Sequence, residues 1–400
     1  MLESRFRIRR HPDQQILPGS CGIPTVSACM IVKNEAAFLE GCLSSLQGHV
    51  DEIVVVDTGS DDETIDIIRR FDCTLIRQKW RDDFSFARNT SIENASGDWI
   101  LYIDADERLS CSEGVALKRL LPGPEAVASR VKFQPRSNMT CYGEMRLFRR
   151  DPRIRFQESM HETIIPSLER VCDEDGLSIS QQYDVSILHL GYEADLSHKH
   201  DRNIPLLYAA IDANPARVYL RFHLGFTLRE LGRREEAARQ LQEGMRLAAL
   251  DGVSARVRIE GTMCAQIRAE IELAAGRPQA ALKVVTAGIS LFDGNLALRW
   301  LEARCRVALK QFQQALALMD PIAKIDGNTF FDDMVAYEKS LFQEDAHGLI
   351  AAARFHLGDY AGASDSYRTA LDYAPESIEL IAKKALCDAR VARLDIGQEP

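Results

Sequence analysis

Residues 95–107 read ASGDWILYIDADE, an apolar run that ends in two aspartates, Asp104 and Asp106. A short run of bulky apolar residues bounded by turn-forming residues predicts a buried strand over 98–104. Residues i and i+2 of an extended strand project from the same face. Ligands of open α/β sheets bind beyond the carboxyl ends of the strands. The segment therefore predicts two neighbouring carboxylates at the ligand edge of a sheet.

Similar runs on both sides of this segment predict the rest of the sheet. Before it, strand-like runs alternate with helical patterns over 36–46, about 62–71 and 84–95. This alternation is typical of a parallel α/β sheet. After it, residues 127–190 are more mixed and contain further strand candidates. The additional predicted strands are 26–32 (VSACMIV), 53–56 (IVVV), 73–77 (CTLIR), 127–134 (VASRVKFQ), 146–150 (RLFRR) and 186–190 (SILHL).

Beyond about residue 200 the sequence shows helical patterns throughout. Four turn positions, Gly232, Gly276, Lys310 and Gly358, are each followed five residues later by Ala, at intervals of 44, 34 and 48 residues. The first and last of these units resemble tetratricopeptide repeats. Each helix pair of such a repeat buries its apolar face against its neighbours, so the units are expected to stack into a solenoid.

This change of pattern divides the chain into three predicted parts. Residues 1–25 are rich in Pro and Gly and are expected to be a loose leader. Residues 26–200 are expected to form the α/β domain, and residues 201–390 an all-α domain of helical repeats. A chain of 400 residues is long enough for two or three domains.

The bulk composition narrows the range of partners. A formal net charge of -10 and a pI of about 5.5 argue against a nucleic-acid-binding surface, which needs an excess of basic residues. No apolar run approaches the ~20 residues of a membrane-spanning helix, and the start of the chain lacks the apolar stretch of a signal peptide. The ten cysteines are scattered, without a CxxC pair. We therefore expect reduced thiols, a cytoplasmic location and no integral membrane segment.

The residue types of Asp104 and Asp106 suit a hard divalent cation. Mg²⁺ and Mn²⁺ prefer carboxylate oxygens, and they share their remaining coordination positions with the oxygens of a diphosphate. Such an ion neutralises charge on a departing nucleoside diphosphate. The alternative is that Asp-x-Asp only closes the strand in a turn. We predict Mg²⁺ or Mn²⁺ as the cofactor because other strand ends are polar as well.

Two of those other strand ends carry the carboxylates Asp57 and Glu35. Asp57 closes a buried run and precedes Thr-Gly-Ser-Asp, and Glu35 follows the first strand within Lys-Asn-Glu. A carboxylate at the ligand edge of the sheet is suited to recognise a base or a ribose. The alternatives are an Asx-type turn with a helix cap for Asp57, and a solvated loop for Glu35.

Four segments resemble, in order and spacing, the hallmark segments of family 2 glycosyltransferases. The resemblance covers about residues 26–200 well and the repeat region loosely. It is closest to the bacterial branch with a C-terminal tetratricopeptide-like domain, which includes enzymes similar to the peptide S-glycosyltransferases of glycosylated bacteriocins. The matching segments are CMIVKNE (29–35), DEIVVVDTGSDDET (51–64), WRDDFSFARN (80–89) and ASGDWILYIDADE (95–107).

The resemblance implies a GT-A fold and an inverting transfer from a nucleotide-diphospho-sugar, with a UDP-sugar as the first expectation. Carried over by motif, Glu35 and Asp57 would contact the nucleoside. Asp104 would face the ribose or the metal-bound diphosphate, and Asp106 would bind the metal. Arg88 would lie over the nucleotide as a phosphate or base contact, since its planar fork suits such groups. The alternative for Arg88 is a surface arginine on a helix.

Two later segments supply the remaining candidates. An inverting transfer needs a general base to deprotonate the acceptor. In FQESMHETI (156–164), Glu162 is our first candidate and His161 the second, unless His161 binds the diphosphate or orients Glu162. A solvated His-Glu pair is the alternative. In SILHL, His189 is either a core histidine or a third metal or diphosphate contact, and Arg146 in EMRLFRR is structural or positions the acceptor.

These features favour an enzyme that transfers a sugar to an acceptor held partly by the repeats. A nucleotidyltransferase would show a Gly-rich phosphate loop after the first strand, where this chain has Lys33-Asn34-Glu35-Ala36. The alternative is a degenerate glycosyltransferase domain that serves as a repeat-based protein-binding scaffold. The expected acceptor is a peptide or protein, or a cell-envelope glycan, and exposed solenoid edges are compatible with a homodimer.

Overall fold

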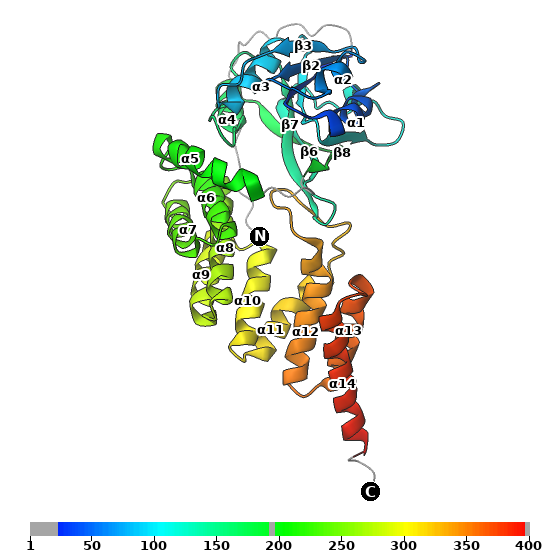
Figure 1. The fold of residues 1–400 in the computed structure, drawn as a ribbon, viewed down its shortest axis with the longest axis vertical. Helices are drawn as coiled ribbons and strands as arrows, with labels where there is room; N and C mark the ends of the chain where they lie inside the picture. The colour runs from blue at the N-terminus through cyan, green and yellow to red at the C-terminus, as the bar shows by residue number, and fades with distance from the viewer. Residues whose placement is uncertain (1–22, 192–196, 397–400) are drawn as a thin grey trace.

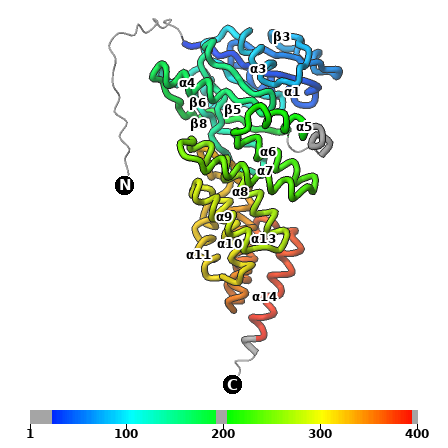
Figure 2. Tube along the Cα trace, turned by 90° about the vertical axis from the view of Figure 1, so that its left-hand side faces the viewer, coloured from blue at the N-terminus to red at the C-terminus, as the bar shows by residue number. Residues whose placement is uncertain are grey.

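The computed structural model describes residues 23–191 and 197–396 (Figure 1). All but the last three residues of the predicted leader 1–25 lie outside these ranges. The α/β part lies at one end of the molecule, and the helices continue from it as a column that ends at α14 (Figures 1 and 2). Within the described ranges, no helix combines the length and the apolar character that are needed to cross a bilayer.

The first half of the α/β part is a parallel sheet, as predicted. Its strands are β1 (Val26–Val32), β2 (Glu52–Asp57), β3 (Thr74–Arg77) and β4 (Trp99–Tyr102), in the order β3-β2-β1-β4. The helices α1 (Ala36–Leu46), α2 (Thr64–Ile68) and α3 (Phe84–Glu93) connect them. Because all four strands run in one direction, their carboxyl ends meet at one edge of the sheet.

The second half extends the sheet with mixed directions. It consists of β5 (Glu107–Cys111), the short helix η1 (Leu117–Arg119), β6 (Ala126–Gln134), β7 (Cys141–Arg149), α4 (Ile165–Asp175) and β8 (Ser178–His189). β7 pairs antiparallel with β4, and the order continues β7-β6-β8-β5. β5 pairs antiparallel with β8, with Glu107 opposite His189. This register brings the end of β8 to the turn that follows β4.

The sheet is buried on both faces because its residues alternate between two apolar clusters. In β1, Ala28 and Met30 pack on the side of α1, whereas Cys29 packs on the opposite side with residues of α3 and α4. Successive side chains of a strand point to opposite faces, so a continuous apolar run such as 26–32 is the expected sequence of a strand covered on both sides.

The helical part is a solenoid that starts after α5 (Ser197–Ala213). Its helices are α6 (Val218–Glu230), α7 (Arg234–Ala248), α8 (Ala255–Ala274), α9 (Pro278–Leu291), α10 (Leu296–Ala308), α11 (Phe312–Ile322), α12 (Glu344–His356), α13 (Tyr360–Tyr373) and α14 (Ile378–Ile396). They pack mainly as consecutive antiparallel pairs, and buried residues of neighbouring pairs form shared clusters. This is the stacking that was predicted from the repeats.

The four predicted turn positions fall between the helices of a pair. Gly232, Gly276, Lys310 and Gly358 all have a left-handed backbone, with φ between 62° and 86°. Glycine adopts this conformation without steric cost, so Lys310 is the strained member of the set. The alanines five residues later are all buried at the helix contacts. The shared turn geometry accounts for the sequence pattern.

The loop between α11 and α12 returns to the α/β part. It forms β9 (Phe331–Asp332), which pairs with the start of β7, and is followed by the short helix η3 (Lys339–Phe342). The backbone N–H of Thr140 donates to the carbonyl of Tyr337 at 2.8 Å, and the Tyr337 N–H donates to Thr140 Oγ1 at 2.9 Å. The solenoid therefore contacts the sheet at a second place, far along the chain from α5. No strand was predicted here, because two residues are too few to show a periodic pattern.

Candidate functional site

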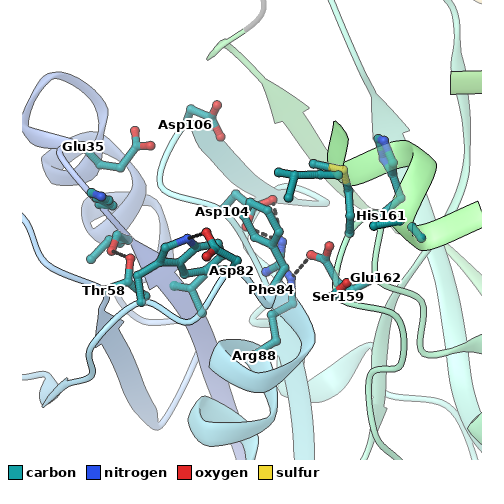
Figure 3. Close-up of a pocket in the computed structure, with 18 of the residues that line it drawn as sticks. Glu35, Thr58, Asp82, Phe84, Arg88, Asp104, Asp106, Ser159, His161 and Glu162 are labelled. Atoms are coloured by element: carbon teal, nitrogen blue, oxygen red, sulfur yellow. Dashed lines mark hydrogen bonds and ion pairs between the residues drawn. The ribbon is translucent and has the colours of Figure 1, made fainter. Parts of the chain in front are cut away.

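A cavity of about 850 Å³ lies where the parallel strands end (Figure 3). Residues after β1, β2 and β4 form one side of it, and small apolar side chains of α5, among them Ala209 and Ala213, form another. All the predicted site residues except Asp57 and Arg146 line this cavity, although they come from distant parts of the sequence. They are Glu35, Arg88, Asp104, Asp106, His161, Glu162 and His189.

Arg88 links these groups. The side chain of Asp83 accepts the N–H of Phe86 and caps α3, which carries Arg88 in its second turn. Arg88 Nε donates to Glu162 Oε1 at 2.6 Å, and its Nη2 lies 2.9 Å from Asp104 Oδ1. Burial lowers the pKa of Arg88, but the two carboxylates outweigh burial and raise it. The guanidinium is buried and charged, so the alternative of a surface arginine is wrong.

Asp104 and Asp106 lie in a turn, which corrects the expectation that they share one face of a strand. β4 ends at Tyr102 and β5 begins at Glu107. The backbone N–H of Asp104 donates to Glu107 Oε2 at 2.8 Å, and the Glu107 N–H donates to the Asp104 carbonyl at 3.0 Å. This local bonding closes the turn and ends the strand earlier than the predicted 98–104. Both carboxylates nevertheless line the cavity.

A buried ion pair supports this turn. Arg146 of β7 donates to Glu107 Oε1 at 2.6 Å and to Oε2 at 3.1 Å, and the two side chains are 8% and 1% exposed. The guanidinium carbon of Arg146 also lies 4.5 Å from the ring centroid of Tyr102 and 4.8 Å from that of Phe133. These contacts give Arg146 a structural role beneath the turn, one of the two roles that the sequence left open.

His189 lies beside Asp106 because β8 pairs with β5. Its Nε2 is 3.2 Å from Asp106 Oδ2. Burial lowers the pKa of His189, but the hydrogen bond and charge of Asp106 outweigh burial and raise it. A protonated imidazole cannot bind a metal, so His189 would have to lose this proton to serve as a ligand.

The predicted metal ligands do not form a complete set by themselves. Among the residues that the structure describes, no three His, Cys, Asp or Glu side chains are grouped to hold a metal ion. Burial raises the pKa of Asp104, but Arg88 and Arg146 outweigh burial and keep it lowered. A deprotonated Asp104 and a nearby Asp106 on one cavity fit a hard cation of the Mg²⁺ type, which is commonly held by one or two carboxylates together with substrate phosphates.

Glu35 and Asp57 differ in where their side chains lie. Glu35 precedes α1 and lines the cavity (Figure 3). Asp57 is buried, and its Oδ1 accepts the backbone N–H groups of Gly59 and Ser60, both at 3.2 Å. This is the Asx-type turn that was the alternative for Asp57. The next residue, Thr58, lines the cavity instead.

A second cavity of about 480 Å³ lies between the sheet and the solenoid. Residues of β6 and β7 line one side of it, and residues of α6, α8 and the loop after β9 line the other. Four residues line both cavities: Arg88, Asp104, His161 and Glu162. The two cavities therefore meet at the pair that the sequence singled out as candidate base and at the ion pairs of Arg88.

The segment that carries His161 and Glu162 is attached to α3. The side chain of Asn89 donates to the carbonyl of Phe156 at 2.9 Å and accepts the Phe156 N–H at 2.8 Å. Together with the bond between Arg88 and Glu162, this contact explains the FSFARN motif. Its polar side chains position a segment some 70 residues later in the chain. The alternative of a solvated His-Glu pair is wrong because neither side chain is exposed.

His161 contacts residues that the sequence did not point to. Its ring stacks on the ring of His223 in α6, with centroids 3.7 Å apart, and meets Tyr219 edge-on at 5.8 Å. Burial and the charge of Arg217 lower the pKa of His161 to about 4, and the pKa of His223 is also lowered, by burial first and then by His161 and Arg217. Contacts between residues so far apart in sequence leave no periodic signal.

Comparison with known proteins agrees with this division of the chain. Residues 27–121 match the family model "Glycosyl transferase family 2", and residues 272–333 match a "Tetratricopeptide repeat" model. A TPR repeat-containing protein of Synechococcus elongatus is 37% identical over 227 residues, which cover 55% of this chain and 56% of the relative. The glycosyltransferase SunS of Bacillus subtilis is 29% identical over 231 residues, which cover 56% of this chain and 53% of the relative. The matches thus span about half of each relative.

Among solved structures, glucosyl-3-phosphoglycerate synthase from Mycobacterium tuberculosis, in complex with Mn²⁺, uridine diphosphate and phosphoglyceric acid, is 19% identical. The TM-score is 0.34, and the match covers 44% of this chain and 73% of that one. The family matches confirm the predicted combination of a family 2 glycosyltransferase domain with tetratricopeptide repeats. With the observed sheet and solenoid, they also confirm the predicted fold class, a GT-A domain followed by an all-α repeat domain.

We expect the substitution Arg146→Met to lower the free energy of unfolding by about 3–5 kcal/mol, because it leaves Glu107 buried without its partner. The double substitution Arg146→Met with Glu107→Met removes both charges, so it is expected to recover much of that loss. Urea unfolding measures both. The control Arg153→Met, in an exposed cluster with Asp151 and Asp175, should change stability little. If Arg146→Met lowers the free energy of unfolding no more than Arg153→Met does, the structural role given to Arg146 is contradicted.

We expect stability to fall as the pH falls from about 6.5 toward 4. The pKa of His161 is lower in the folded than in the unfolded chain, so below pH 6.5 the unfolded chain binds a proton that the folded one does not. At pH 5, this effect of His161 alone should lower the free energy of unfolding by about 2 kcal/mol. Urea unfolding at pH 7.5, 6.5 and 5.5 should show a weaker pH dependence for His161→Phe than for the wild type. If His161→Phe shows the same pH dependence of stability as the control His356→Phe, His161 is not the cause of the loss of stability at low pH.

Proposed function

We propose that the chain is an inverting glycosyltransferase that moves a sugar from a nucleotide-diphospho-sugar to an acceptor with the help of a divalent cation. The observation that supports this most is the pair of cavities that share Arg88, Asp104, His161 and Glu162. A transfer needs two substrates whose reacting atoms meet at one place, and these four residues lie where such a meeting would occur.

The larger cavity is our candidate for the donor. It lies at the carboxyl ends of the parallel strands, where α/β sheets bind nucleotides, and Glu35 and Thr58 line it on the side of β1 and β2. Asp104 and Asp106 would hold Mg²⁺ or Mn²⁺, with His189 as a third contact to the ion or the diphosphate. When bound, the ion would stabilise the charge of the departing nucleoside diphosphate. A UDP-sugar is our first choice of donor.

Within this proposal, Asp57 takes part indirectly. Its carboxylate accepts backbone N–H groups of its own turn and so fixes the backbone that leads into Thr58. A direct contact of Asp57 with the nucleoside would require these bonds to open. Arg88 likewise acts by holding Asp104 and Glu162 in place, with its positive charge close to where a diphosphate would bind.

Glu162 is our candidate for the general base. Arg88 fixes one of its oxygens, and the residue faces both cavities, so its carboxylate is oriented toward a nucleophile that enters from the second cavity. A base must accept a proton from the attacking group of the acceptor. His161 is less suited to that task, because burial and Arg217 lower its pKa to about 4 and its ring is stacked on His223. We therefore assign His161 the task of orienting Glu162.

The second cavity is our candidate for the acceptor. Both parts of the chain line it, and its apolar lining includes four methionines, Met139, Met145, Met263 and Met334. Methionine side chains are flexible and adapt to varied partners, which suits a peptide or protein segment better than a glycan. A cell-envelope glycan is the second candidate. The domain limits 26–200 and 201–390, a cytoplasmic location and a homodimer stay predictions.

We expect the purified protein to release one nucleoside diphosphate from a panel of nucleotide sugars with Mn²⁺ or Mg²⁺, and to stop when EDTA is added. The substitution Asp106→Asn should lower this release by about 100-fold, because it removes charge and a ligand from the ion. The control Asp61→Asn changes an exposed aspartate near the same sheet edge that does not line the cavity.

Binding and turnover together separate this proposal from the scaffold alternative. Direct binding of each nucleotide sugar is measured by calorimetry under the same metal conditions. If no nucleotide sugar binds with either metal, the domain is degenerate and the chain acts as a protein-binding scaffold. If release is equal in Asp106→Asn and in the control, the metal assignment is wrong.

A further inference from the structure

The segment before Glu162 has an unusual backbone. Glu158 and His161 both have a left-handed conformation, with φ of 73° and 53°. Side chains other than glycine adopt this region at a cost, and such strain persists only where the surrounding contacts impose it. Two such residues within four positions, next to the candidate base, raise the question of which contacts hold them.

The α/β domain holds the backbone of this segment. The N–H of Phe84 donates to the carbonyl of Ser159 at 2.9 Å, and the Ser85 hydroxyl donates to the carbonyl of Glu158. Both donors belong to the first turn of α3. These bonds hold the backbone at 158 and 159, but they leave the side chains of Glu158 and His161 to other partners.

Among the described residues, these side chains find their partners on the solenoid side of the junction. Arg217 Nε donates to the two carboxylate oxygens of Glu158 at 3.2 and 3.3 Å, and Asn214 Nδ2 donates to one of them at 3.3 Å. The ring of His161 stacks on His223 at 3.7 Å. Both left-handed residues are therefore held by residues of the turn between α5 and α6 and of α6 itself.

The solenoid residues are themselves firmly placed. Arg217 Nη1 donates to Glu260 Oε1 and Oε2 of α8 at 3.0 and 3.1 Å, and the side chains of Arg217 and Glu260 are 14% and 5% exposed. Buried charges of this kind are costly unless paired on every side. The chain Glu158–Arg217–Glu260 thus connects the strained segment to the second repeat helix pair. The Nε2 atom of His223 is buried and has no hydrogen-bond partner in the described part of the chain, so ring stacking is the visible contribution of this side chain.

We propose that Arg217 and His223 are positioning residues of the transfer site. They hold Glu158 and His161 in the left-handed conformation that directs Glu162 toward both cavities. The solenoid then completes the catalytic geometry, in addition to any acceptor that it binds. This inference rests on the proposed function, but it also predicts how firmly the backbone of residues 157–163 is held, which can be tested without turnover.

The first test compares turnover of the full chain with donor and metal for three variants. Glu158→Gln weakens only the bond across the junction and leaves Arg217 paired with Glu260, and His223→Ala removes the stacked ring. Each is expected to lower kcat by about 10- to 100-fold with less than about a twofold change in the donor KM, because a misplaced base slows chemistry more than binding. His223→Phe restores a stacking ring and should recover most of the kcat.

The matched control is Arg221→Met. Arg221 lies in α6, four residues after the N-cap Arg217, but it donates to Gln240 of α7 at 2.6 Å, within the solenoid. Its kcat should stay near that of the wild type. If Glu158→Gln and His223→Ala have the kcat of this control, or if the donor KM rises as much as kcat falls, the positioning role is refuted.

The second test uses amide hydrogen exchange of a peptide that spans 157–163, measured by mass spectrometry. The backbone N–H of Gln157 donates to the carbonyl of Thr163, and the N–H of Thr163 donates to the carbonyl of Gln157, both at 2.9 Å. These two hydrogen bonds should protect both amides from exchange. We expect protection to fall at least severalfold in Glu158→Gln and His223→Ala, but not in Arg221→Met. Unchanged protection overturns the inference even if the enzyme is active. A wild type that turns over no donor refutes the proposed function and leaves this measurement valid.

Discussion

A single buried guanidinium organises the candidate site. Arg88 stands between Glu162, on the segment after β7, and Asp104, on the turn after β4. Without the positive charge of Arg88, the carboxylates of Asp104 and Glu162 would lie close together and largely shielded from water. The folded chain could accommodate them only if one were protonated or if the two moved apart. The position of each carboxylate therefore depends on the same side chain. Arg88 itself is fixed by α3, so the start of that helix determines the geometry of groups far from it in sequence.

Charge pairing of this kind recurs on either side of Arg88. The pair Arg146–Glu107 supports the turn of Asp104 from within the sheet, and Arg217 joins Glu158 to Glu260 across the junction with the solenoid. Arg88 and Arg217 each pair with two carboxylates from different segments, and Arg146 pairs with one carboxylate of another strand. Burying such groups is costly unless they are fully paired, so the pairs favour one arrangement of sheet, loop and solenoid over slightly displaced ones. Both cavities lie between these elements.

Much of this site could be predicted because parallel strands end at one edge. Glu35, Asp104 and Asp106 were recognised from local patterns and Arg88 from the family resemblance, and all four lie on one cavity. The early end of β4 was not predicted, and a turn at Asp-x-Asp was given only as the alternative. Glu107 takes the backbone N–H that would have continued the strand, and hydropathy does not record such a side-chain bond. His223 and the pairing of β9 were missed for a different reason. They are contacts between distant segments, which no periodicity within either segment reveals.

The irregular spacing of the repeats reflects which parts of the solenoid line the second cavity. The interval of 34 residues from Gly276 to Lys310 has the length of an ordinary tetratricopeptide repeat, and none of its residues lines either cavity. The 44-residue interval contains the long helix α8, whose first half lines the second cavity. The 48-residue interval contains the loop of β9, which lines it through residues 334–336. Stacking alone requires only the regular unit. The two longer intervals are where the solenoid extends to the sheet and closes the space in which an acceptor would meet Glu162.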